Sequence, residues 1–240
     1  MKTLVRIGAA VALLVATGVV ASAQSTTPPP TTTTPAGIVL DAPWKQAIFK
    51  LATEKLQHSA WGVGHSERDY LLATRLAAED KLVVDTDILF AAAFLHDVAA
   101  FPSWSKEGID HTDRAAEVVP EILTSAGFPA TKIEAVQEAV RNHMYYRADA
   151  TRPEAIVLHD ADTLDFLGAI GVARIISLTT RQKGWAPDLA TAVKTLDGFS
   201  NDLPSKVTTV AGRKRAATRA AEMKGFLETL KAESENGKAW

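Results

Sequence analysis

The chain has 240 residues, of which 47% are hydrophobic and 22% charged, and this composition indicates one globular domain with a full core. It contains no cysteine, which excludes disulfides, cysteine-ligated metals and a lipid-modified cysteine anchor. The formal net charge is −2, and the one short basic run is Arg213-Lys214-Arg215, on an expected late helix. We read this run as a solvated helix face, and we expect no nucleic-acid polymer as a partner.

Residues 1–23 have the pattern of a signal peptide. Lys2 and Arg6 give a positive start, the stretch from Ile7 to Val20 is apolar, and Ala21-Ser22-Ala23 fits a cleavage site. An uncleaved membrane anchor is the alternative, but the apolar stretch is short for a span of about 20 residues. We therefore expect a secreted or periplasmic protein without stable membrane insertion after cleavage. Cleavage removes two basic residues and no acidic ones, which leaves a net charge of −4.

Residues 24–40 are expected to form a linker. The stretch from Ser25 to Gly37 is rich in Thr and Pro and has almost nothing to bury, which predicts a disordered or polyproline-like tether. The domain itself is expected to span residues 41–233, with Asp41 as a helix cap before Pro43. Residues 234–240 are expected to form a polar tail that frays.

The remainder of the chain has hydrophobic residues at helical spacing, and no alternating strand pattern is longer than four residues. This pattern predicts a single all-α domain, folded as a helical bundle. The expected helices cover residues 44–56, 65–79, 86–97, 111–126, 129–143, 153–162, 164–182, 187–199 and 205–233.

The most informative stretch runs from Ala91 to Val98, where five apolar residues lead directly into His96 and Asp97. Polar groups at the end of so apolar a helix are costly unless they are paired or bound to a metal. A buried His–Asp hydrogen bond and a metal site both satisfy this requirement. Five of the six histidines lie at expected helix ends beside apolar segments, which favours a shared site: His65, His96, His111, His143 and His159.

The order of these motifs resembles the HD superfamily of metal-dependent phosphohydrolases. The motifs are Gly64-His65-Ser66-Glu67-Arg68, Phe94-Leu95-His96-Asp97, Asp110-His111, Arg141-Asn142-His143 and the run from His159 to Arg174. The resemblance implies four metal ligands: His65, His96, Asp97 and Asp162, with Asp160 as the alternative to Asp162. It also implies that His111 and His143 contact phosphate or a second metal.

Two positions depart from the family pattern. Asp69 stands where the family usually has an apolar residue, so it either pairs with Arg68 or disturbs the site. Thr163 replaces a usual basic residue, which weakens the expected contacts with a substrate.

A site of His and Asp ligands without thiolate suits a divalent ion such as Mn, Fe, Mg, Co, Ni or Zn. Such an ion produces hydroxide near neutral pH, and phosphate esters need this nucleophile together with positive charge. The residues expected to act in catalysis are Asp97, Arg68, His111 and His143, with Arg114 and Lys106 as further sources of charge. We expect hydrolysis of a small phosphorylated, nucleotide-like substrate. The alternatives are a non-catalytic metal- or ligand-binding domain and other hydrolytic or lyase chemistry, and the oligomeric state stays open.

Overall fold

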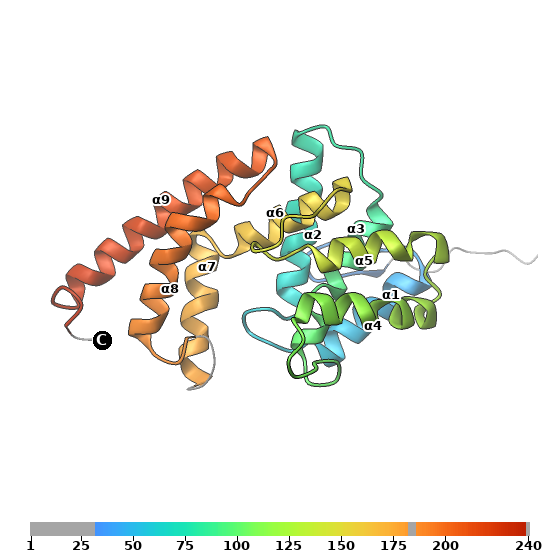
Figure 1. Ribbon diagram of the computed structural model, residues 1–240, viewed down its shortest axis with the longest axis horizontal. Helices are drawn as coiled ribbons and strands as arrows, with labels where there is room; N and C mark the ends of the chain where they lie inside the picture. The colour runs from blue at the N-terminus through green and yellow to red at the C-terminus, as the bar shows by residue number, and fades with distance from the viewer. Residues whose placement is uncertain (1–31, 182–185, 239–240) are drawn as a thin grey trace, which may run out of the picture. The chain divides into compact units, whose positions relative to one another are not determined.

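The computed structural model describes residues 32–181 and 186–238, and Figure 1 shows their arrangement. These residues are mostly helical, as predicted. The expected signal peptide and the first residues of the linker lie outside the described residues. The elements are β1 (Thr32–Thr33), β2 (Val39–Leu40), α1 (Pro43–Lys55), α2 (Val63–Glu79), α3 (Thr86–Leu95), α4 (His111–Ala126), α5 (Ile133–Arg141), α6 (Pro153–Asp165), α7 (Gly168–Ser177), α8 (Leu189–Asp202) and α9 (Val210–Glu233), with short 3-10 turns at Val98–Ala100, Ala130–Lys132, Leu178–Arg181 and Leu203–Ser205.

The second half of the expected linker is folded, which differs from the predicted tether. β1 and β2 form a small antiparallel hairpin in which Thr32 pairs with Leu40. Ile38 and Leu40 are buried in the core, and the backbone N–H of Ala36 donates to Glu67 of α2 at 3.0 Å. The Thr- and Pro-rich composition of this stretch did not predict that Ile38 and Leu40 would be buried. Their burial holds the hairpin against the domain.

Helix α3 forms the centre of the core. Every residue from Ile88 to Leu95 is buried, and Trp44 of α1 packs edge-on against Phe90 with 5.6 Å between ring centroids. Burial of each large apolar side chain stabilises the fold by about 1.5–3 kcal/mol. The helix ends at Leu95, two residues earlier than expected, so His96 and Asp97 lie in the turn that follows it. The apolar core thereby holds the end of α3 in a fixed place.

The break between α6 and α7 lies later than predicted. We expected helices at 153–162 and 164–182, but α6 continues to Asp165 and α7 begins at Gly168. Gly168 has a φ of +70°, which glycine adopts without the steric cost that a side chain would add, and this backbone ends α6. Asp162 consequently lies inside α6 and not at a helix boundary.

Other helix ends differ from the prediction by a few residues because short 3-10 turns take up the termini. A 3-10 turn at Ala130–Lys132 precedes α5, which begins at Ile133 and not at Pro129. A similar turn at Leu203–Ser205 extends beyond α8, so α9 begins at Val210.

Two carboxylates from other helices hold the first turn of α9. Asp80, which follows α2, accepts hydrogen bonds from the N–H groups of Val210 and Ala211 at 2.6 and 3.0 Å. Asp160 of α6 accepts from the N–H groups of Thr208 and Thr209 at 2.9 and 2.7 Å. These N–H groups have no partner within α9, and negative charge is favourable at this end of a helix. Helices α7, α8 and α9 lie side by side in Figure 1, and these bonds connect them to α2 and α6.

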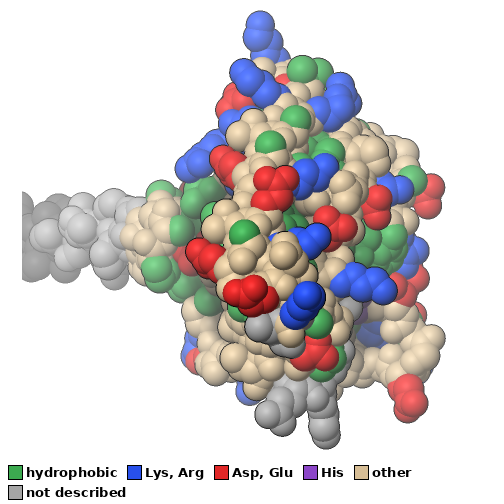
Figure 2. All heavy atoms as spheres, turned by 90° about the vertical axis from the view of Figure 1, so that its left-hand side faces the viewer, with side chains coloured by type: hydrophobic (Ala, Val, Ile, Leu, Met, Phe, Trp, Pro, Cys, Tyr) green, Lys and Arg blue, Asp and Glu red, His purple; other side chains and the backbone are tan. Residues whose placement is uncertain are grey.

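The basic run on α9 is part of a mixed surface. Arg215 donates to both carboxylate oxygens of Glu79 of α2. Figure 2 shows positive and negative side chains interspersed over the face that lies on the left of Figure 1. Arg213–Arg215 therefore belongs to a solvated helix surface.

No single helix among the described residues has the length and apolarity of a membrane span. α6 and the segment Gly168–Thr180 pass that test by length and composition only as a pair, and the pair is bent by 68°.

Gly171 of α7 gives the first testable prediction. A Cβ atom there would lie 2.2 Å from the carbonyl oxygen of Phe166 and 3.0 Å from Met223 of α9. We expect Gly171→Ala to destabilise the fold by roughly 2 kcal/mol or more, since the backbone or α9 must move. Gly198→Ala in α8 is the matched control, because a Cβ atom there meets nothing within 4 Å. The control should stabilise by up to about 1 kcal/mol, and denaturant unfolding of both variants measures the difference. Equal stability of the two variants would contradict the packing described.

Candidate metal centre

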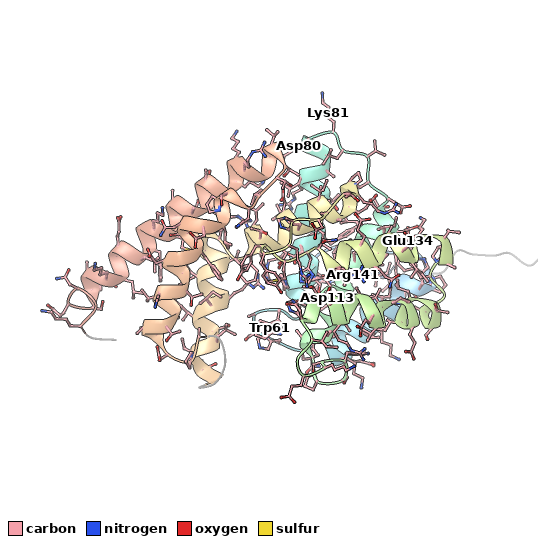
Figure 3. All side chains as sticks on the ribbon, in the orientation of Figure 1. Trp61, Asp80, Lys81, Asp113, Glu134 and Arg141 are labelled. Atoms are coloured by element: carbon pink, nitrogen blue, oxygen red, sulfur yellow. The ribbon has the colours of Figure 1, made fainter. Side chains whose placement is uncertain are left out.

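Helix α2 supplies the first residues of the centre. It begins directly after Gly62, where a Cβ atom would lie 2.5 Å from the carbonyl oxygen of His58, so this close approach requires glycine. Trp61 and Asp80 mark the two ends of α2 in Figure 3. His65 lies in its first turn, and Asp69 lies four residues later on the same face. Both side chains point into the protein, where they are buried.

The four residues expected to bind the metal lie together. Nε2 of His65 is 3.1 Å from Nε2 of His96, 3.6 Å from Asp97 and 3.2 Å from Asp162. Nε2 of His96 is 3.4 Å from the same oxygen of Asp97. The donors come from α2, the turn after α3, and α6, and α2 and α6 pack along one another. The helical core therefore brings residues almost 100 positions apart to one point.

Acceptor groups bind Nδ1 of both imidazoles. Nδ1 of His65 donates to Asp165 at 2.8 Å, and Nδ1 of His96 donates to the carbonyl oxygen of Ala93 at 2.9 Å. In a neutral imidazole the other nitrogen, Nε2, then carries a lone pair. Two lone pairs 3.1 Å apart repel each other unless a proton or a cation lies between them.

Asp165 orients His65 and was not among the predicted site residues. Arg68 donates to both of its oxygens at 2.9 and 2.8 Å, and Arg174 of α7 lies 3.0 Å from it. Burial alone would raise the pKa of Asp165, but hydrogen bonds from His65 and Arg68 hold it below its usual range. The ionised carboxylate therefore keeps the proton of His65 on Nδ1, as expected for a group behind a metal ligand. In the sequence, the feature that could have pointed to Asp165 is its position three residues after Asp162.

Arg68 is committed to this arrangement. Besides Asp165, it donates to the carbonyl oxygen of Gly64 at 3.0 Å. The structure thus places this expected catalytic residue as the group that holds Asp165. Arg174, which is 4% exposed, donates to the carbonyl oxygen of Ala60 and adds a second positive charge behind the site.

Asp69 faces the same point as the four expected ligands. Its carboxylate is 3.1 Å from Nε2 of His65 and 3.7 Å from Nε2 of His96. The expected ion pair with Arg68 is not formed, because the guanidinium binds Asp165. Burial raises the pKa of Asp69 to about 7, against the opposite effect of His65. Within the described part of the chain, neither oxygen of Asp69 has a hydrogen-bond partner.

Asp97 connects the buried cluster to a more open side. One of its oxygens faces His65 and His96, and the other lies 3.5 Å from Nε2 of both His111 and His143. His111 opens α4 and its side chain is 27% exposed, whereas His143 follows α5 and is fully buried. Nδ1 of His143 donates to the carbonyl oxygen of Val140 at 2.7 Å, so Nε2 faces Asp97. Burial lowers the pKa of His143, which favours its neutral form.

The structure separates Asp162 from the alternative, Asp160. Asp162 lies against His65, whereas Asp160 accepts the hydrogen bonds that hold the start of α9. His159 is adjacent to Asp160 and lines a cavity of about 560 Å³ beside the start of α9. Thr163 is buried, and its hydroxyl has no hydrogen-bond partner among the described residues.

The other two basic residues considered lie outside the cluster. Arg114 donates to the carbonyl oxygen of Trp104 and to Glu117, which leaves it as a surface residue of α4. Lys106 is exposed on the loop before α4.

The residues of this cluster fit a divalent cation. Asp69, one oxygen of Asp162 and Nε2 of His143 are buried without hydrogen-bond partners in the described residues. The four carboxylates of Asp69, Asp97, Asp162 and Asp165 and the guanidinium groups of Arg68 and Arg174 leave a formal charge of −2. Mixed imidazole and carboxylate donors are the ligands of divalent transition metals and of magnesium.

Comparisons with known proteins agree with the resemblance seen in the motifs. Residues 62–167 match the family model of the HD domain. A predicted HD superfamily hydrolase from an uncultured Thermotogales bacterium is 25% identical with a TM-score of 0.56, covering 78% of this chain and 91% of that chain. A protein from Lactobacillus plantarum is also 25% identical, with a TM-score of 0.62 and coverage of 79% and 96%.

Bacillus subtilis YpgQ, whose structure was determined in complex with ADP, shares the fold. It is 21% identical, with a TM-score of 0.59 and coverage of 79% of this chain and 97% of that chain. These structural matches show that the fold is that of HD superfamily hydrolases. No curated protein matches the chain.

Asp160 provides a test of the separation from Asp162. We expect Asp160→Ala to destabilise the fold by roughly 2–4 kcal/mol, because it leaves the N–H groups of Thr208 and Thr209 without their acceptor. Binding of a divalent ion should be unaffected in the folded variant. Denaturant unfolding and metal analysis measure the two effects, and loss of the metal at full stability would contradict this assignment.

The loss of stability in Asp160→Ala should depend on pH. Burial opposes ionisation of Asp160, but hydrogen bonds from His159 and Thr209 lower its pKa. A lowered pKa stabilises the fold above the unfolded value of about 3.9. The difference in unfolding free energy between wild type and Asp160→Ala should therefore shrink as the pH falls below about 4.

Proposed function

We propose that this protein is a metal-dependent phosphohydrolase that cleaves a phosphate ester or anhydride bond of a small molecule. The observation that supports it is the buried set of imidazole and carboxylate donors directed at one point, beside the partly exposed groups Asp97 and His111. A closed set of donors would indicate a purely structural ion, whereas catalysis requires one accessible side.

His65, His96, Asp97 and Asp162 would hold the ion. A bound divalent ion lowers the pKa of water and polarises phosphate oxygens, which is the chemistry that phosphate hydrolysis requires. The donor set is compatible with Mn, Fe, Mg, Co, Ni or Zn. Asp165 holds His65 in the tautomer that presents its Nε2 lone pair.

The groups on the accessible side would transfer protons and bind the charged phosphate oxygens. The oxygen of Asp97 that faces His111 and His143 can orient a nucleophilic water or accept its proton. Neutral His143 presents a lone pair there, and in its protonated form it can donate to a phosphate oxygen. Arg68 acts indirectly, because it positions Asp165, which in turn orients His65.

A nucleotide-like substrate is part of the proposal. The support is that YpgQ, which has the same fold, was crystallised with ADP. A second candidate function is a non-catalytic metal-binding domain, which the unusual Asp69 favours because its carboxylate adds another donor at the centre. Phosphate release from an aryl phosphate, with and without a chelator, separates the two functions.

The central prediction compares four variants with wild type. Asp97→Ala and Asp162→Ala each remove a buried anionic donor, so both should abolish phosphate release and lower metal content. His143→Ala should keep the metal while turnover falls roughly 10–1000-fold, on the scale of losing one transition-state contact. Asp160→Asn is the control on α6, because its carboxylate holds α9. The measurements are metal content, circular dichroism and turnover, and full activity of Asp97→Ala or of chelator-treated protein would refute the hydrolase function.

We also propose export, on the basis of residues 1–23. The recovered protein should begin at or near Gln24, because Ala21-Ser22-Ala23 follows the apolar stretch. Mass spectrometry of the periplasmic fraction measures this terminus, and a membrane-embedded protein that keeps Met1 would contradict it.

A further inference from the structure

Asp69 lies inside the protein with no part of its surface exposed. No donor among the described residues forms a hydrogen bond to either of its oxygens. An ionised carboxylate in such a position is strongly unfavourable unless a positive group compensates it. Both guanidinium groups of the centre are bound to Asp165, so neither of them serves Asp69.

The distances around Asp69 match those between ligands of one ion. Two ligands about 2.1 Å from an ion are about 3.0 Å apart at a right angle and about 3.4 Å apart at a tetrahedral angle. Asp69 lies 3.1 Å from Nε2 of His65 and 3.7 Å from Nε2 of His96, in the same range as the contacts of Asp162. Donor atoms of His65, Asp69, His96 and Asp162 all lie within 4.8 Å of one another.

A simple hydrogen bond between His65 and Asp69 explains less. Nδ1 of His65 already donates to Asp165, so Nε2 could donate to Asp69 only from a doubly protonated ring. That single proton would face three acceptors, because Nε2 of His96 and an oxygen of Asp162 are equally close. A central cation satisfies all of these lone pairs together.

We propose that Asp69 is an additional ligand of the divalent ion, so that the centre has two imidazole and three carboxylate ligands. The ligand set is then His65, Asp69, His96, Asp97 and Asp162. This inference rests on the proposed metal site, and it replaces the expectation that Asp69 pairs with Arg68 or disturbs the centre. Five protein ligands favour ions that accept five or six ligands, such as Mn²⁺ or Fe²⁺, over four-coordinate Zn²⁺.

The test titrates Mn²⁺ into chelator-treated full-length protein by calorimetry and measures the melting temperature with and without Mn²⁺. The variants are Asp69→Asn, which keeps the shape, and Asp69→Leu, which places an apolar side chain there. Glu67→Gln is the matched control on the same helix, because Glu67 binds the backbone of Ala36 and not the cluster.

We expect both Asp69 variants to bind Mn²⁺ at least about 10-fold more weakly, and the control to bind as wild type does. The Mn²⁺-dependent rise in melting temperature should shrink in the same order. Without metal, Asp69→Leu should melt at a higher temperature than wild type, because an unpaired buried charge has been removed. If Asp69 only paired with His65, metal-free Asp69→Leu would instead melt at a lower temperature than wild type.

Unchanged Mn²⁺ affinity in both Asp69 variants would overturn the inference, as would a metal-free Asp69→Leu protein that melts lower with an unchanged metal-dependent shift. Wild-type protein that binds neither Mn²⁺ nor Fe²⁺ would overturn it as well. The outcome for the proposed function is separate. Wild-type protein that binds Mn²⁺ but shows no turnover would refute the hydrolase function and leave the ligand role of Asp69 intact. Turnover by wild-type protein, with unchanged Mn²⁺ affinity in the Asp69 variants, would refute the ligand role and leave the hydrolase function intact.

Discussion

The contact between His65 and Asp165 is the interaction on which the centre depends. Asp165 accepts the Nδ1 proton of His65 and is itself held by Arg68 and Arg174. These groups come from α2, α6 and α7, so the contact fixes three helices relative to one another as well as the direction of one lone pair. The hydrogen bond to Asp165 holds Nδ1 of His65 away from the cluster and directs Nε2 toward His96 and Asp162.

The sequence predicted the convergence of His65, His96, Asp97 and Asp162 because ligand-type residues at the ends of apolar helices are hard to explain otherwise. It did not predict Asp165 or Arg174, since a carboxylate and an arginine on helices usually indicate surface. For Asp69 the sequence left two roles open, an ion pair with Arg68 or a disturbance of the site, because the direction of its side chain depends on how α2 packs in the fold. The helix break was placed too early because the φ of +70° at Gly168 depends on how α7 packs against α9.

The segment after the matched HD domain also contributes to the centre. The family model ends at residue 167, yet Arg174 of α7 is buried against Asp165 and lies 3.5 Å from His65. Its position follows from the packing of α7 on α9, whose first turn is in turn held by Asp80 and Asp160. The carboxylates of α6 therefore have different roles. Asp160 fixes the start of α9, whereas Asp162 and Asp165 face His65 in the cluster.

The two sides of the centre differ in what water can reach. Asp69, His96 and His143 are fully buried, whereas Asp97 and His111 keep some exposed surface. In the buried half, unscreened negative charge makes the binding of a cation favourable, because protein groups alone leave several lone pairs facing one another. In the open half, Asp97 presents its second oxygen to two imidazoles and to solvent. The carboxylate of Asp97, two residues after the end of α3, thus connects the buried half of the cluster to the open half.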